Sequence, residues 1–131
     1  MLLTYLIYSA FYPSEDFYRT DFSEVTGIEL PENVEFKHKS ATYPDHHGDY
    51  TSISIIKVGR GFYNQLPKVL LKKGLKENKQ KILATEFDKI LEHIDNLKIE
   101  KEFSMEEGVG VYYYVGFLTD NETIIVQRMS W

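Results

Sequence analysis

The sequence contains no cysteine among its 131 residues. This excludes a disulfide scaffold, a Cys-ligated zinc or iron–sulfur site and a thiol nucleophile. A chain of this length buries roughly two thirds of its unfolded surface on folding, so a hydrophobic core alone can stabilise it. The sequence also lacks internal repeats and linkers rich in Gly, Pro or Ser. It therefore predicts a single domain over residues 1–131, with no cofactor.

Basic side chains are in deficit, because 15 Lys and Arg stand against 20 Asp and Glu, for a net charge of -5. A nucleic-acid partner is therefore not expected, since nonspecific binding to phosphates needs a basic surface. The charge is unevenly spread: residues 1–56 carry three basic and nine acidic side chains, a balance of -6. Residues 57–101 carry eleven basic and six acidic ones, a balance of +5. The acidic first part favours a basic protein partner.

Long hydrophobic runs are missing as well. The apolar opening over residues 1–13 is shorter than the roughly 20 residues of a membrane-spanning helix. The first basic residue is Arg19, so the opening lacks the basic start of a secretory leader. We therefore expect a cytoplasmic protein with no membrane partner. The alternative is an envelope-associated structural domain held by this apolar segment.

Local patterns predict an α+β fold, with two to four helices packed on an antiparallel sheet of four to five strands. Helices are expected over residues 14–26, 62–74 and 79–98, the second beginning near Gln65 because Pro67 fits a first turn. The first range could hold one helix or two short ones, because Asp21 and Glu24 have the spacing of a capping box. Gly27 and Gly74 follow two of them as left-handed caps. Strands are expected over residues 33–43, 50–58, 109–118 and 123–129, as two hairpins. The strand 109–118 is apolar on both faces, which is typical of a central strand.

The most conspicuous polar cluster is the loop that holds Asp45, His46, His47 and Asp49. Two carboxylates and two imidazoles could bind a divalent ion, which gives a metal-dependent hydrolase as an alternative function. Adjacent residues of an extended chain point to opposite sides, however, and no H-E-x-x-H spacing occurs. We therefore predict no metal site and no catalytic residue, and interpret the loop as a structured turn or a partner contact. His38 and His93 are isolated in the sequence and are expected to be structural or surface residues.

A second acidic group is formed by Glu102, Glu106 and Glu107, which we interpret as a turn leading into the last hairpin. Together with the acidic first half it could form a negative face that binds a basic partner. The predicted partner-binding residues are Asp45, His46, His47, Asp49, Glu102, Glu106 and Glu107.

Three strings resemble a loosely defined group of small bacterial proteins. They are FSEVTGIELPENVEF (22–36), YPDHHGDYTSISIIKV (43–58) and VYYYVGFLTDNETIIVQRMSW (111–131), with T-G-I-x-L-P, an apolar residue or His before G-D, and a last hairpin ending in Ser–Trp. Some members look like immunity proteins encoded beside secreted or contact-dependent toxins. The resemblance implies a small α+β protein that neutralises a cognate toxin domain by covering its active site. It assigns no functional residue, and none of the strings is a catalytic motif.

Overall fold

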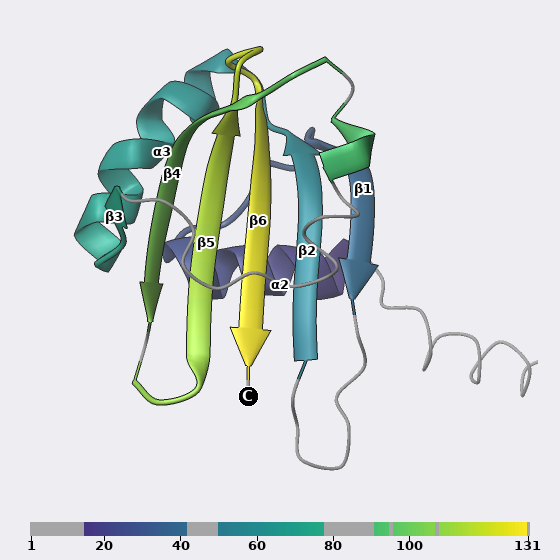
Figure 1. The fold of residues 1–131 in the computed structure, drawn as a ribbon. Coiled ribbons are helices and arrows are strands. Elements are labelled where there is room, and N and C mark those ends of the chain that lie inside the picture. The colour runs from purple at the N-terminus through teal and green to yellow at the C-terminus, as the bar shows by residue number, and fades with distance from the viewer. Residues whose placement is uncertain (1–14, 42–49, 78–90, 95, 107, 131) are drawn as a thin grey trace, which may run out of the picture.

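The computed structural model describes residues 15–41, 50–77, 91–94, 96–106 and 108–130. They form an α+β fold in which two helices pack on one face of a six-stranded antiparallel sheet (Figure 1). The helices are α2 (Glu15–Thr26) and α3 (Arg60–Lys73), with a 3-10 turn η1 (Leu91–His93). The strands are β1 (Glu35–Ala41), β2 (Tyr50–Lys57), β3 (Lys76–Glu77), β4 (Ile99–Glu106), β5 (Val111–Leu118) and β6 (Thr123–Ser130).

The strand order in the sheet is β1-β2-β6-β5-β4-β3. The two expected hairpins, β1–β2 and β5–β6, are confirmed, and β2 pairs with β6 along its whole length to join them. The last hairpin therefore occupies the centre of the sheet, as its two apolar faces predict. The Asp120 carboxylate stabilises its turn by accepting hydrogen bonds from the backbone N–H groups of Glu122 and Thr123 at 2.9 Å.

Side chains on the two faces of the sheet form separate clusters. The cluster under the helices contains Phe22 of α2, Leu70 of α3 and Phe117 of β5, all fully buried. The cluster on the opposite face contains Ile53, Tyr114 and Ile125, and Ile94 just after η1 belongs to it. Alternation along each strand produces this division, because successive side chains point to opposite faces.

Both described helices end as their sequences predict. Gly27 has a φ of 81° and Gly74 one of 115°, a backbone conformation that glycine adopts without strain. The Gly27 N–H donates to the Ser23 carbonyl at 2.8 Å, and the Gly74 N–H donates to the Leu70 carbonyl at 3.1 Å. The end of α2 fixes where the following loop leaves the helix, which matters for the site below.

Several expectations need correction. The sheet has six strands rather than four to five, because 99–106 is a strand and Lys76–Glu77 pairs with it. Helix α3 begins at Arg60 rather than near Gln65. Of the expected helix 79–98, residues 79–90 lie outside the described residues. In the part that is described, Leu91–His93 forms a 3-10 turn, and β4 follows it. Glu102 and Glu106 thus belong to a strand, because β5 needs a hydrogen-bonded neighbour on its outer side.

Candidate functional site

Of the seven residues predicted to contact a partner, the structure describes two, Glu102 and Glu106. Asp45, His46, His47 and Asp49 lie outside the described residues, and so does Glu107. Glu102 and Glu106 share the face of β4 that is turned away from the helices, opposite Gly116 and Tyr112 of β5. Partner contacts by these seven residues stay a prediction.

Glu102 is engaged within the fold. The Tyr114 hydroxyl donates a hydrogen bond to Glu102 Oε1 at 2.8 Å, and the Tyr114 ring is fully buried. Burial and the neighbouring Glu102 carboxylate raise the pKa of Tyr114 far above its usual value, so the phenol stays a hydrogen-bond donor. Glu102 therefore holds a buried aromatic side chain in place, whereas Glu106 is exposed.

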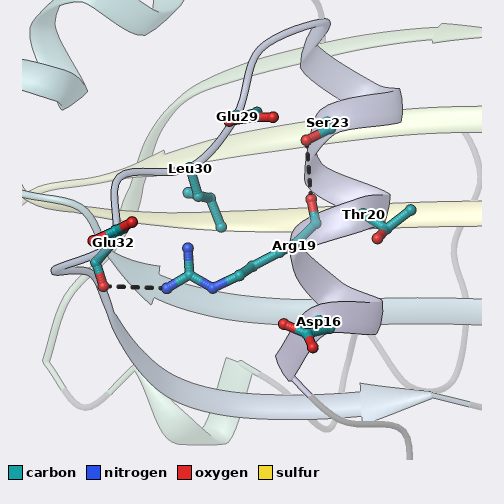
Figure 2. A pocket seen from close by; sticks show the side chains of 7 residues that line it. All are labelled: Asp16, Arg19, Thr20, Ser23, Glu29, Leu30 and Glu32. Atoms are coloured by element: carbon teal, nitrogen blue, oxygen red, sulfur yellow. Dashed lines mark hydrogen bonds between the residues drawn. The ribbon is translucent and has the colours of Figure 1, made fainter.

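A groove that the sequence analysis missed lies along α2 and the loop that follows it. It encloses about 470 Å³ and is lined by Asp16, Arg19, Thr20, Ser23, Glu29, Leu30 and Glu32 (Figure 2). Leu30 is 7% exposed and belongs to the core under the helices. The left-handed cap at Gly27 turns the chain back along the helix, so that Glu29 and Glu32 line the same groove as Asp16.

Arg19 connects the two sides of the groove, which are α2 and the loop that follows it. Figure 2 shows its side chain reaching from α2 towards the backbone at Glu32. Its guanidinium donates to the Pro31 carbonyl at 3.1 Å and to the Glu32 carbonyl at 3.3 Å, and it lies 5.8 Å from the centre of the Phe36 ring. Because these donors are directed at backbone carbonyls, the side-chain carboxylates of the groove keep their oxygens for other contacts.

The groove is acidic. Asp16, Glu29 and Glu32 are exposed, and Arg19 is the one basic side chain among its lining residues. None of the ion pairs found within the described ranges uses these three carboxylates. A groove of this kind suits basic side chains of a partner, which can pair with carboxylates that form no ion pair within the described ranges. The only sequence signal for it was the negative balance of residues 1–56.

A buried polar network fixes α2, and with it the groove, to the sheet. Asp21 is 6% exposed, and its carboxylate accepts a hydrogen bond from the hydroxyl of Ser52 on β2. Arg128 lies opposite Ser52 in the register of β2 and β6, and its Nε is 2.8 Å from Oε2 of Glu24. The spacing of Asp21 and Glu24 is therefore used for attachment to the sheet inside one continuous helix and not for a capping box.

This network predicts a pH dependence of stability. Burial raises the pKa of Asp21, and this outweighs the Ser52 hydrogen bond and the positive charge of Arg128, which lower it. The folded protein therefore holds this proton more tightly than the unfolded chain, and stability falls as pH rises from about 4 through the native pKa. Urea unfolding of the wild type and Asp21→Asn from pH 4 to 8 should show the wild type losing stability relative to the variant. The same change at exposed Asp16 is the control, and a constant difference between wild type and Asp21→Asn contradicts the interpretation.

His38 and His93, which are far apart in the sequence, lie in contact in the structure. The rings of His38 on β1 and His93 of η1 stack with their centres 3.9 Å apart and an angle of 14° between planes. Imidazole lone pairs lie in the ring plane, so two parallel stacked rings do not direct them at one ion. Across the described ranges, no three His, Asp or Glu side chains are grouped as metal ligands.

None of the helices in the part of the chain that the structure describes has the length and apolar character needed to cross a membrane. No family model, no curated protein and no solved structure matches this chain. Its functional interpretation therefore depends on its own residues and geometry.

Proposed function

We propose that this protein is a protein-binding module, an immunity protein that neutralises a cognate bacterial toxin domain in the cytoplasm by covering its active site. The single observation that carries this proposal is the acidic groove along α2. It is lined by three exposed carboxylates, and Arg19 holds the loop that forms one of its sides. Three strings of the sequence resemble a loosely defined group of small bacterial proteins, some of which look like immunity proteins, and this resemblance supports the same proposal.

The groove fits the chemistry of such a partner. A toxin that cleaves nucleic acid presents basic side chains in its active site, because its substrate is a polyphosphate. Asp16, Glu29 and Glu32 offer carboxylates to those side chains, and Arg19 keeps the loop that carries two of them in place. Complementary charge raises the rate of encounter and sets the orientation of the two proteins. The covered toxin can then no longer admit its substrate.

The first test is co-expression with the protein encoded immediately upstream, followed by size-exclusion chromatography and a growth assay. We expect a stable 1:1 complex and rescue of growth. The second test is the double variant Glu29→Lys, Glu32→Lys, which leaves Asp16 in the first turn of α2, where an acid stabilises the helix. The backbone carbonyls that bind Arg19 are also retained. We expect association to slow about 10- to 100-fold at low salt and protection to be lost.

The matched control is Glu77→Lys, Glu92→Lys, which makes the same change of charge at two exposed positions outside the groove. It should alter association less than about threefold. If the upstream protein neither binds nor affects growth, the immunity function is wrong. If it binds and both double variants behave alike, the groove is not the interface, and Glu106 is the next residue to reverse.

A further inference from the structure

A second cavity, of about 200 Å³, lies on the face of the sheet opposite α2 and α3. Its apolar wall is formed by Ile55 of β2, Leu118 of β5, and Ile94 and Leu97 of the segment after η1. Ile55, Leu118 and Ile94 are buried, and Leu97 is half-buried. In Figure 1, η1 lies in front of the sheet near β1 and β2, whereas α2 lies behind it. The segment at η1 therefore covers part of the face that is turned away from the helices. These four side chains form one apolar side of the cavity.

The polar part of the cavity is predominantly basic. Lys37 of β1, Lys57 of β2 and His93 of η1 line it, and Asp120 is the one acidic residue in its lining. Burial alone would raise the pKa of Asp120, but hydrogen bonds from Thr123 and Glu122 lower it. Its carboxylate already accepts those bonds, including one from the Thr123 hydroxyl at 2.6 Å. The positive charge of Lys57 lowers this pKa as well, so Asp120 is ionised and offsets one of the two lysine charges. The lining keeps an excess of one positive charge, and the oxygens of Asp120 are already engaged in the β5–β6 turn.

The two lysines have counter-ions that a ligand can replace. Lys37 Nζ is 3.2 Å from Glu35 Oε1, and Lys57 Nζ is 3.7 Å from Glu122 Oε2. Both lysine side chains are more than 40% exposed, and ion pairs at such positions contribute about 0–1 kcal/mol. His93 is held in position by the stacked ring of His38. Side chains that carry nitrogen groups, from three elements, therefore line one cavity.

We propose that this cavity binds a small organic carboxylate with a short apolar tail. The carboxylate lies between Lys37, Lys57 and His93, and the tail packs on Ile55, Leu118 and Leu97. Such a group could be a free organic acid or the C-terminal residue of a peptide, since both present the same chemistry. The site is separate from the acidic groove, so it can be tested whether or not the proposed immunity function holds.

The test is calorimetric titration of the full chain with three probes: benzoate, the peptide Gly-Gly-Phe, and the same peptide with an amidated C-terminus. We expect a dissociation constant of about 1 mM or tighter for at least one free carboxylate, a range reasonable for ligands of this size. Binding of benzoate alone identifies a free acid as the ligand, and binding of Gly-Gly-Phe identifies a peptide C-terminus. The amide should not bind.

Two variants locate the binding. Lys37→Met with Lys57→Met should weaken binding at least about tenfold, because each Met keeps an unbranched side chain one atom shorter than Lys and removes the charge. Lys68→Met with Lys72→Met on the exposed side of α3 removes the same charge elsewhere and should leave binding within about twofold. In a proton NMR titration, the bound carboxylate should also shift the His93 ring resonances.

Three results would overturn the proposal. One is the absence of binding by both free carboxylates at about 10 mM, a concentration well above the expected dissociation constant. Another is equal binding of the amide, which would mean that the charge is not recognised. The third is an equal weakening of carboxylate binding by the two lysine double variants. Binding would then depend on the overall charge of the protein and not on this cavity.

Discussion

Replacing Phe22 by Ala is expected to lower the free energy of unfolding by about 3–5 kcal/mol. Phe22 is fully buried on α2 and belongs to the core between the helices and the sheet. Its ring centre lies 6.0 Å from that of Phe62 on α3, so truncation removes packing against both the sheet and the second helix. The loss is a large fraction of the 5–15 kcal/mol that stabilises a typical domain. Urea unfolding followed by circular dichroism measures it.

Leu71 provides the control for this change. It lies on α3 but is 58% exposed, so Leu71→Ala should change the free energy of unfolding by no more than about 0.5 kcal/mol. If Phe22→Ala costs less than about 1 kcal/mol, α2 is not packed on the sheet as described. The acidic groove would then lose its structural basis, because Asp16 and Arg19 lie on this helix.

Gly116→Ala is expected to lower the free energy of unfolding by about 1–3 kcal/mol, the usual cost of overpacking a core. A Cβ at this position would lie 2.8 Å from the hydroxyl oxygen of Tyr114 and 3.2 Å from the ring. A flexible side chain would move aside, but Tyr114 is fully buried and its hydroxyl is hydrogen-bonded to Glu102. The expected result is therefore strain together with loss of that hydrogen bond.

A double-mutant cycle with Tyr114→Phe tests this explanation. The Phe variant removes the nearest clashing atom, so the two changes together should cost less than their sum by at least about 0.5 kcal/mol. Gly61→Ala is the matched control, because no atom lies within 4 Å of a Cβ there and Ala favours the α3 helix. It should stabilise the protein by about 0.5–1 kcal/mol. Additive effects at Gly116 and Tyr114 would contradict the steric explanation.

The elements that the sequence predicted well are those with a strong local signal. The β-branched run of β2 and the apolar last hairpin have the period-two pattern of strands, and both were placed within a few residues. The caps at Gly27 and Gly74 were predicted because few residues other than glycine adopt their positive φ. Local pattern was sufficient for these elements, and also for the central position of the last hairpin.

Strand β4 shows where local pattern is not sufficient. Its sequence, IEKEFSME, carries four charged residues and only one fully buried apolar side chain, Phe103. It becomes a strand because the outer edge of β5 supplies a ladder of hydrogen-bonding groups that must be paired. The apolar spacing of residues 79–98 predicted a helix. In the described part of that range, Leu91–His93 is a 3-10 turn, and Ile94 and Leu97, which follow it, pack on the sheet.

By itself, the sequence determined the fold class, the two hairpins, the ends of the two described helices and the acidic character of the first part of the chain. These follow from residue type and spacing over a few neighbouring positions. Only the tertiary structure decided which charges gather. It places Asp16, Glu29 and Glu32 in the lining of one groove with Arg19, and it places Lys37, Lys57 and His93, from three elements, in the lining of another cavity. Such convergence depends on how distant segments pack on one sheet, and the spacing of residues along a chain does not encode it.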